Sequence, residues 1–288
     1  EGGVTRHTAR HVLVATGGRP LRPDVAGAER GWVSDDVFAL PELPRRLLVV
    51  GGGYIALELA GVFSGLGSEV TLAYRGPLLL RGFDEAVRAF VTAELRKRGI
   101  DVRLHTAIEC LEDGPDGSIC AMLPHAESID VDAALFAIGR APNTAGLGLE
   151  ALGVALDADG AIVVDARYRS SVEGIFALGD VTNRINLTPV AIEEGIALAH
   201  QLFGDADRRL DYDHVPTAVF SQPPVATVGL GEHEVPGAHV YESDFRPMRH
   251  TVSGRDARAY MKVVVDPSDD RVRGVHLVGP DAPEIIQG

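Results

Sequence analysis

The chain has 288 residues, which is long enough for two domains. Its formal net charge of −14 argues against nucleic acid or an anionic membrane surface as a partner. The longest uncharged apolar-rich run lies between Arg46 and Glu58, and it is too short and too rich in glycine to span a bilayer. We therefore expect neither a nucleic-acid partner nor a membrane partner.

The first predicted strand lies in "RHVLVATGGRP", where an apolar run ends in a glycine turn. A connection rich in Pro and Gly follows. The next apolar run, Leu47 to Val50, is typical of a buried parallel strand, and it leads into three glycines and an amphipathic helix. A strand, a glycine-rich turn and a helix in this order form the context that a dinucleotide-binding fingerprint requires.

Three small residues of this fingerprint have expected tasks. Gly51 allows the tight turn, Gly53 lets a pyrophosphate approach the backbone, and Ala56 permits close packing of the helix on the strand. The free N–H groups and the positive end of the helix dipole then face the phosphates. The segment therefore predicts a dinucleotide site.

The end of the following strand, Glu69 to Tyr74, indicates which dinucleotide binds. Enzymes that use NAD commonly place Asp or Glu there to hold the ribose 2′-hydroxyl. This chain instead has Tyr74 and Arg75, with Arg81 six residues further on. Two guanidinium groups can hold a 2′-phosphate by charge-assisted hydrogen bonds, which predicts NADP. The alternative is that both arginines are ordinary solvated loop residues.

A helix is predicted from Asp84 to Arg98, because acidic residues begin it, basic residues end it and Gly99 stops it.

The two cysteines, Cys110 and Cys120, flank a predicted hairpin turn. Their spacing matches neither a CxxC redox motif nor a zinc site, so we expect buried structural thiols and no metal. So few cysteines favour the reducing cytoplasm.

A further strand, Ala134 to Ile138, leads into Gly139. The motif "GIFALGDV" then places Asp180 at the carboxyl end of a buried strand, where open α/β sheets bind ligands. Its carboxylate can accept hydrogen bonds from sugar or polyol hydroxyls, or it can be a helix cap or turn residue. A helix is predicted from Pro189 to Phe203. From His214 onward, alternating strands and turns predict an antiparallel α+β unit.

Taken in order, these motifs resemble the class I pyridine nucleotide-disulfide oxidoreductase family, and within it the glutathione reductases. The resemblance covers nearly the whole chain and rests on "ATGGRP", "GGGYIALELAG", "YRGPLLLRGFD", "AIGRAPN", "GIFALGDVTNRINLTPVA", "FSQPPVATVGL" and "DAPEIIQG". Dihydrolipoamide dehydrogenases, in contrast, would show an acidic residue near Tyr74.

The resemblance implies an α/β fold in which a Rossmann-like NADP-binding domain is inserted in a split FAD-binding domain, with an α+β interface (dimerisation) domain after it. The implied parts are the end of the first FAD segment, the NADP domain, the second FAD segment and an incomplete interface domain, at residues 1–27, 28–142, 143–212 and 213–288.

The resemblance also implies roles for single residues. Thr16 and Gly17 would lie against FAD, Asp180 would hold its ribityl chain, and Leu187 and Thr188 would face the flavin ring. Tyr54 would cover the nicotinamide pocket and move when the cofactor arrives, and Glu58 would pair with a lysine on the flavin side. The residues implied for the NADP site are Gly51, Gly52, Gly53, Ile55, Ala56, Glu58, Arg75, Arg81, Gly139 and the backbone around Ala218.

The family's redox cysteine pair, CxxxxC, would precede Glu1, and its catalytic His-Glu pair would follow Gly288. We therefore expect the chain to be the middle of an enzyme, unable to reduce a disulfide as given. Ile196 stands where some glutathione reductases place an arginine for the glutathione carboxylate, so that contact is not expected here.

The implied whole is a cytoplasmic homodimer that maintains thiol redox balance. NADPH would pass hydride to FAD, the flavin would open an enzyme disulfide, and the resulting dithiol would reduce glutathione disulfide. Two alternatives stay open. One is a related flavoenzyme, such as a dihydrolipoamide dehydrogenase or mercuric reductase, and the other is a catalytically silent nucleotide-binding module.

Overall fold

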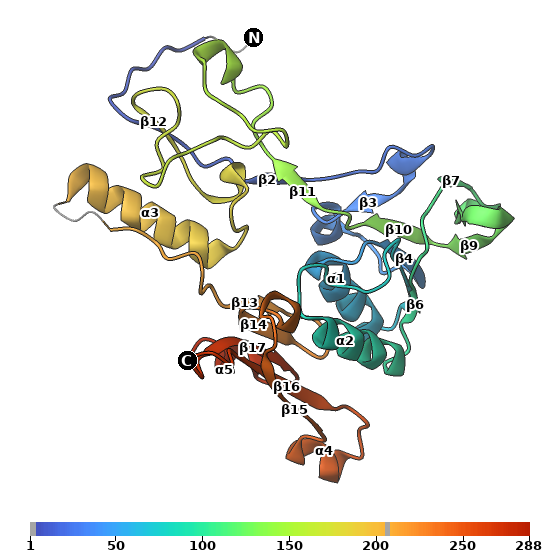
Figure 1. Cartoon of the computed structure of the whole chain (residues 1–288). Helices are drawn as coiled ribbons and strands as arrows, with labels where there is room; N and C mark the ends of the chain where they lie inside the picture. The colour runs from blue at the N-terminus through green and yellow to red at the C-terminus, as the bar shows by residue number, and fades with distance from the viewer. Residues whose placement is uncertain (1–3, 205–207) are drawn as a thin grey trace. The chain divides into compact units, whose positions relative to one another are not determined.

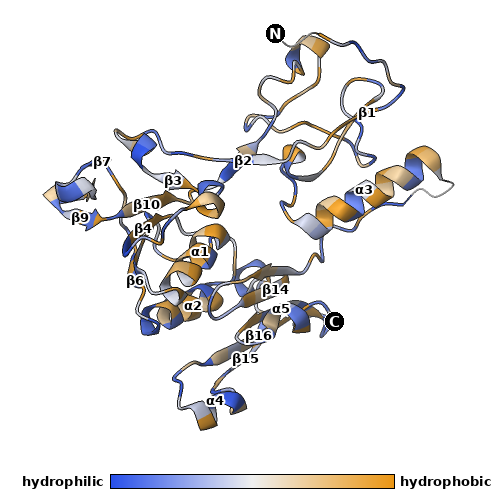
Figure 2. Ribbon diagram, turned by 180° about the vertical axis from the view of Figure 1, so that it is seen from behind, coloured by the Kyte–Doolittle hydropathy of each residue, from blue (hydrophilic) through white to orange (hydrophobic). Residues whose placement is uncertain are grey.

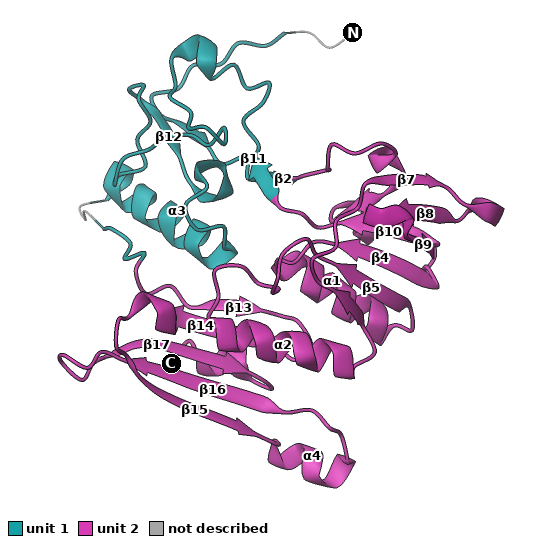
Figure 3. Ribbon diagram, turned by 45° about the vertical axis from the view of Figure 1, so that its right-hand side comes forward, with its two compact units in different colours: residues 1–19, 140–212 teal, residues 20–139, 213–288 magenta. Residues whose placement is uncertain are grey.

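The computed structural model describes residues 4–204 and 208–288 (Figure 1). The chain divides into two compact units (Figure 3). One contains Glu1–Arg19 and Arg140–Tyr212, and the other contains Pro20–Gly139 and Asp213–Gly288. The chain therefore leaves the first unit, builds most of the second, returns to the first and then completes the second.

The larger unit contains a parallel sheet in the order β3-β10-β4-β5-β6. Its strands are β3 (Trp32–Val33), β4 (Arg46–Val50), β5 (Glu69–Ala73), β6 (Asp101–Arg103) and β10 (Ala133–Phe136). Leu47, Leu48 and Val49 are fully buried, as expected for a strand covered on both faces. Figure 2 shows the apolar character of this central part of the sheet.

Two helices connect these strands. α1 (Tyr54–Gly65) follows the glycine turn, and its apolar side packs on the sheet through Leu57 and Ala60. α2 (Glu85–Lys97) begins as the sequence predicts, because the Asp84 side chain accepts a hydrogen bond from the Ala86 N–H at 3.0 Å.

A small antiparallel sheet in the same unit is formed by β7 (Cys110–Asp113), β8 (Ile119–Met122) and β9 (Ser128–Val131). The predicted hairpin is confirmed. The prediction of buried thiols is wrong, because Cys110 and Cys120 are both only half-buried and free. Side chains alternate across a strand, so Leu111 and Ala121 occupy the core face and their cysteine neighbours take the other.

The C-terminal part of the larger unit is a five-stranded antiparallel sheet in the order β13-β14-β17-β16-β15. This confirms the antiparallel α+β unit that the sequence predicts after His214. Its elements are β13 (Thr217–Val219), β14 (Val225–Gly229), β15 (His239–Phe245), α4 (Met248–Ser253), β16 (Ala259–Val265), β17 (Val272–Val278) and α5 (Ala282–Ile285). Val219, Val225 and Val278 share one apolar core with the parallel sheet, so both sheets belong to one packed body.

The smaller unit is built around β1 (Val12–Val14), which pairs in parallel with β12 (Ile175–Ala177). β2 (Gly18–Pro20) pairs with β11 (Arg140–Pro142), and α3 (Thr188–Phe203) follows β12. The short 3-10 helices of the chain are Ala28–Arg30, Asp36–Ala39, Pro115–Gly117, Pro124–Ala126, Glu150–Leu152, Gly179–Thr182 and Glu232–Glu234. Among the described residues, no helix is long and apolar enough to cross a membrane.

Candidate functional site

The fingerprint turn is shaped by close backbone contacts at Gly51. Gly51 adopts a φ of 146°, and a Cβ there would lie 2.2 Å from the Ala137 carbonyl oxygen at the end of β10. The Gly51 N–H also donates to the Ala73 carbonyl at 2.9 Å. Only glycine fits this point, where three neighbouring strands end together.

Gly52 and Gly53 are required for different reasons. A Cβ at Gly52 would lie 2.6 Å from the ring of Tyr74, so the aromatic ring takes the space above this glycine. A Cβ at Gly53 would meet no atom within 4 Å. Gly53 is the N-cap of α1 and has an extended backbone, and no side chain caps the helix there. Nothing in this unit demands glycine at that position, whereas a closely approaching phosphate would.

The helix lies close to the strand that precedes it. Ala56 is fully buried, and its Cβ lies 3.4 Å from where a Gly51 side chain would begin. Ile55 is half-buried against the same apolar core. The N–H groups of the first turn of α1 therefore face the open space beside Gly53, an arrangement suited to a pyrophosphate.

The loop that carries Arg75 and Arg81 is anchored by buried side chains and a backbone hydrogen bond. Leu79 and Leu80 are buried between the two arginines, and the Leu80 N–H donates to the Gly52 carbonyl at 2.6 Å. Both arginine side chains are exposed, and neither forms an ion pair with another residue that the structure describes. The anchored loop thus presents two guanidinium groups beside the fingerprint turn.

Tyr54 and Glu58 lie one helical turn apart on α1. Tyr54 is 42 % exposed, and the Glu58 carboxylate accepts a hydrogen bond from the Phe220 N–H at 2.8 Å. Burial raises the pKa of Glu58, and this hydrogen bond opposes the rise. Because Phe220 follows β13, the strand of Ala218 lies against α1.

Gly139 lies beyond β10, at the carboxyl edge where Gly51 follows β4 and Tyr74 follows β5. Its φ is 138°, and its carbonyl accepts a hydrogen bond from the Leu21 N–H at 3.0 Å. The predicted NADP residues therefore gather within the larger unit, at one edge of the parallel sheet and along the helix above it.

The predicted FAD residues lie in the smaller unit, at the carboxyl ends of β1 and β12. The Thr16 hydroxyl donates to the Asn143 carbonyl at 2.7 Å, and Gly17 has a φ of 70°. Asp180 lies beside this turn, with its Cβ 3.7 Å from the place of a Gly18 side chain. Within the described residues, the half-buried Asp180 carboxylate accepts no hydrogen bond. It is therefore available to a ligand hydroxyl.

Leu187 and Thr188 open α3 directly after this region. Leu187 is the N-cap and Thr188 is the first helical residue, with no side-chain cap on the helix. Thr188 is exposed, so its hydroxyl and the nearby backbone are accessible from outside the unit.

Sequence reasoning missed Glu194, which holds the turn before Asp180. Glu194 is 1 % exposed, and its carboxylate accepts hydrogen bonds from the Gly179 N–H at 2.7 Å and the Tyr212 hydroxyl at 2.6 Å. Burial, followed by this carboxylate bond, raises the pKa of the Tyr212 phenol. The signal in the sequence was an acidic residue between apolar residues on the buried side of α3.

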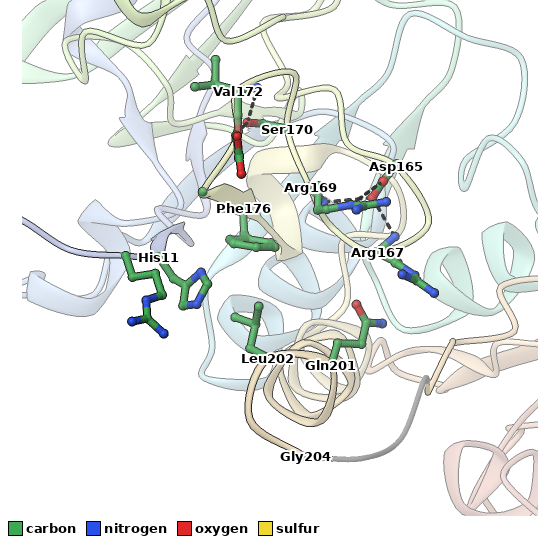
Figure 4. A pocket seen from close by; sticks show the side chains of 13 residues that line it. His11, Asp165, Arg167, Arg169, Ser170, Val172, Phe176, Gln201, Leu202 and Gly204 are labelled. Atoms are coloured by element: carbon green, nitrogen blue, oxygen red, sulfur yellow. Dashed lines mark hydrogen bonds and ion pairs between the residues drawn. The ribbon is translucent and has the colours of Figure 1, made fainter.

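A hollow of about 1130 Å³ in the smaller unit is a separate feature (Figure 4). His11 and Gly174 on its wall precede β1 and β12, whereas Thr16 and Asp180 follow them. Because these strands are parallel, the hollow lies at the opposite edge from the predicted FAD residues. Figure 4 shows Arg169 directed to Asp165, with the ion pair at 2.9 Å. Elsewhere, too, the described residues include no cluster of His, Cys, Asp and Glu suited to a metal.

The comparisons with known proteins agree with the fold. Residues 1–195 match the family described as pyridine nucleotide-disulphide oxidoreductase, and residues 215–288 match its dimerisation domain. The chain therefore belongs to the pyridine nucleotide-disulphide oxidoreductase family.

Curated relatives are named as glutathione reductases or trypanothione reductase. The chain is 50 % identical to glutathione reductase of Burkholderia cepacia over 98 % of its own length and 63 % of the relative's. It is 44 % identical to the chloroplastic/mitochondrial glutathione reductase of Pisum sativum, covering 98 % of this chain and 52 % of that one. Trypanothione reductase of Trypanosoma congolense is 42 % identical, with coverages of 98 % and 59 %. The chain thus spans about half to two thirds of the length of these relatives.

A solved structure with the same fold is the HOCl-induced flavoprotein disulfide reductase RclA from Escherichia coli. It has a TM-score of 0.87 and 31 % identity, covering 96 % of this chain and 65 % of that chain. Its Cu(II) complex is similar at a TM-score of 0.88 and 30 % identity, covering 96 % of this chain and 64 % of that one.

Proposed function

We propose that this chain is the nucleotide-binding and interface part of an FAD-dependent NADPH:disulfide oxidoreductase that reduces glutathione disulfide. The observation that carries the proposal is the set of groups at the carboxyl edge of the parallel sheet. The turn at Gly51 to Gly53 leaves space for a pyrophosphate, and the anchored loop presents Arg75 and Arg81 beside it.

The residues present fit both cofactors. In the larger unit, the first turn of α1 would hold the pyrophosphate, and Arg75 and Arg81 would hold the 2′-phosphate. In the smaller unit, the unpartnered Asp180 carboxylate would accept a hydroxyl bond from the ribityl chain, and Thr16, Gly17, Leu187 and Thr188 would line the FAD site. When bound, the two cofactors supply hydride transfer.

The chain's own side chains would orient and seal the nicotinamide end. Tyr54 would cover the pocket, because a phenol at the first turn of α1 is accessible but is a poor base at neutral pH. Glu58 would be a positioning residue, since its carboxylate already fixes the backbone at Phe220 next to the strand of Ala218. Gly139, Ile55 and Ala56 would shape the remaining wall.

The overall reaction would convert NADPH, a proton and glutathione disulfide into NADP⁺ and two glutathione thiols. The names of the Burkholderia cepacia and Pisum sativum relatives support this substrate. The substituted Ile196, 37 % exposed on α3, would leave one carboxylate of the substrate without an arginine partner at that position.

We further propose a homodimer and a cytoplasmic location. The match of residues 215–288 to the dimerisation domain supports the first, and the small number of cysteines supports the second. We assign residues 1–27 and 143–212 to the FAD domain, 28–142 to the NADP domain and 213–288 to the interface domain. The compact units divide instead after residues 19, 139 and 212.

The test is a comparison of substrates with the full-length protein. Glutathione disulfide should be reduced with NADPH at a kcat/KM at least about a hundredfold above that with lipoamide or with Hg(II). Faster reduction of lipoamide with NADH would instead identify the dihydrolipoamide dehydrogenase alternative. No turnover of any of these substrates, with FAD bound, would identify a silent module.

A further inference from the structure

Lys262 is a buried cation in the C-terminal sheet. It is far from Arg75 and Arg81 in the sequence, but a chain of contacts connects it to their loop in the structure. The chain has only two lysines, Lys97 and Lys262, and all its other permanently charged basic side chains are arginines. Lys262 lies on β16 and is only 2 % exposed. Among its lysines and arginines, the chain therefore has a compact ammonium group, and not a guanidinium, at the most buried position.

The ammonium group of Lys262 is paired with two carboxylates. Its Nζ lies 2.9 Å from the Asp84 carboxylate and 2.7 Å from the Glu232 carboxylate. Asp84 is 2 % exposed, while Glu232 is largely exposed. Burial opposes the charge on Lys262, but the bonds from Glu232 and Asp84 outweigh it and raise the pKa of Lys262. The buried partner of the lysine is therefore Asp84.

Asp84 is the N-cap of α2, so the ion pair fixes the start of that helix. One carboxylate oxygen accepts the Ala86 N–H at 3.0 Å, and the other accepts the Glu232 N–H at 3.1 Å. Without Lys262, a carboxylate would remain buried with no opposite charge in contact, which is strongly unfavourable. The first turn of α2 is thus connected to β16.

Two more contacts continue this connection along α2. The Phe90 ring stacks on Tyr260 with centroids 5.2 Å apart, and the Glu94 carboxylate accepts the Arg258 N–H at 3.2 Å. Arg258 directly precedes β16, and Tyr260 and Lys262 lie two positions apart on it, so their side chains share one face of the strand, which lies along the helix. Figure 3 shows α2 beside the C-terminal sheet, and α2 contacts β17 as well.

The start of α2 in turn holds the arginine loop. Arg88, one turn into the helix, donates through Nε to the Leu79 carbonyl and through a terminal nitrogen to the Leu78 carbonyl, both at 2.7 Å. Leu78 and Leu79 lie between Arg75 and Arg81. The loop is therefore held on one side by Gly52 and on the other by α2.

From this chain of contacts we infer that Lys262 is a positioning residue for recognition of the 2′-phosphate. It acts through Asp84 and the first turns of α2 to hold Arg75 and Arg81 where they meet the phosphate. The inference rests on the proposed NADPH site. It adds that β16, which contains none of the residues proposed for the NADPH site, sets the cofactor preference.

The experiment measures the dissociation constants of NADP⁺ and NAD⁺ for the full-length protein, because the two ligands differ only in the 2′-phosphate. The variants are Lys262→Met, the charge-free pair Asp84→Asn with Lys262→Met, and Lys97→Met as the matched control. Lys97 is the other lysine of the chain and lies on α2, but its side chain is 41 % exposed and pairs with Glu94.

In Lys262→Met we expect the Kd of NADP⁺ to rise about tenfold, with the Kd of NAD⁺ changed less than about threefold. The double variant keeps an N-cap oxygen but lacks the connection to β16, so its Kd of NADP⁺ should rise at least about threefold. If Lys262→Met does not fold, the double variant alone tests whether Lys262 positions the arginine loop. Lys97→Met should change neither constant.

The inference is overturned if a folded variant lacking Lys262 keeps the wild-type ratio of the two constants. It is also overturned if both constants rise by the same factor, since that would show general loosening of the domain. Equal wild-type affinity for NADP⁺ and NAD⁺ would overturn the proposed cofactor choice and this inference with it. Loss of preference in Lys262→Met but a wild-type ratio in Lys97→Met would support the inference.

Discussion

At the scale of single residues, neighbouring positions of one motif are constrained by different forces. Gly51 is required by its φ and by the Ala137 carbonyl, and Gly52 is required by the Tyr74 ring. Gly53 is required by neither. The contrast separates the glycines that build the turn from the one that leaves room for a ligand. The same reasoning applies to Asp180, whose carboxylate has no described partner.

Replacing Asp180 with alanine should therefore deplete the flavin rather than unfold the protein. We expect full-length Asp180→Ala to be purified with less than about half of the wild-type flavin per chain, because a charge-assisted bond to a ligand contributes about 1.5–3 kcal/mol. Absorbance of bound flavin per protein is the measurement.

The matched control is Asp157→Ala. The Asp157 carboxylate accepts the Asp159 and Ala161 N–H groups at 2.9 and 2.8 Å, so it is a structural turn residue. That variant should melt at a lower temperature and keep its flavin. Full flavin occupancy in Asp180→Ala would show that Asp180, too, is only structural.

Tyr54 provides the second prediction at this scale. If its ring covers the nicotinamide pocket without taking part in proton transfer, Tyr54→Ser should keep the fold and flavin and change kcat by less than about tenfold. Crystal structures of the wild-type protein with and without NADPH would then show two ring positions. A single rotamer in both states would exclude a moving cover.

At the scale of elements, α3 holds the turn that precedes Asp180, which we propose to bind FAD. The buried Glu194 accepts the Gly179 N–H, so removing its charge should weaken the turn that carries Asp180. Full-length Glu194→Gln should melt several degrees lower and lose flavin, because a hydrogen bond to a buried carboxylate contributes about 1.5–3 kcal/mol.

The adjacent Glu193 offers a control for this prediction. Glu193 pairs with Arg208 at 2.5 Å and is about half exposed, so Glu193→Gln should change melting by less than about 1 °C. Thermal melting and flavin content are measured on both variants. Equal effects of the two substitutions would show that the buried contact to Gly179 is unimportant.

The elements that the sequence predicted well are those with strong local patterns. β4, the glycine turn and α1 combine an apolar run, special backbone positions and a helical repeat, and Asp84 signals the start of α2 directly. β15 has no comparably strong local pattern, because as an edge strand it is mostly exposed and lacks a buried repeat.

The candidate site divides in the same way. Gly51 to Gly53, Arg75, Arg81 and Asp180 were predicted from motifs or resemblance, because their neighbours along the chain define their setting. Glu194 and Lys262 were missed, since each acts on a residue 15 or more positions away. Only the folded chain shows that Lys262 reaches Asp84, 178 positions earlier.

At the scale of the whole molecule, we expect His276 on β17 to make the stability of the larger unit dependent on pH. Burial lowers the pKa of His276, and its ring nitrogens contact the Thr227 hydroxyl at 2.5 Å and the Leu230 carbonyl at 3.1 Å. The carboxylates of Asp84 and Glu234 favour the charged ring and Lys262 disfavours it, but burial is the largest effect.

Because the folded state resists protonation of His276, its contribution to stability is present above the unfolded pKa near 6.5 and is lost as the pH falls below it. The melting temperature of the wild-type chain should thus fall more between about pH 7.5 and 5.5 than that of His276→Gln. An equal fall in the melting temperature of both proteins would contradict this prediction. The other histidines are present in both proteins, so their effects cancel in the comparison.

The most direct test of the proposed function is anaerobic titration of the flavin in the full-length protein with NADPH and, separately, with NADH. The account predicts that one equivalent of NADPH changes the flavin absorbance transiently, as two electrons pass through FAD to the enzyme disulfide, and that glutathione disulfide then reoxidises the protein. NADH should reduce the flavin at least about tenfold more slowly. In the triple variant with Tyr74→Glu and neutral residues for Arg75 and Arg81, the order of the two nucleotides should reverse. Equal reduction by NADPH and NADH in the wild type, or an unchanged ratio in the triple variant, would contradict it.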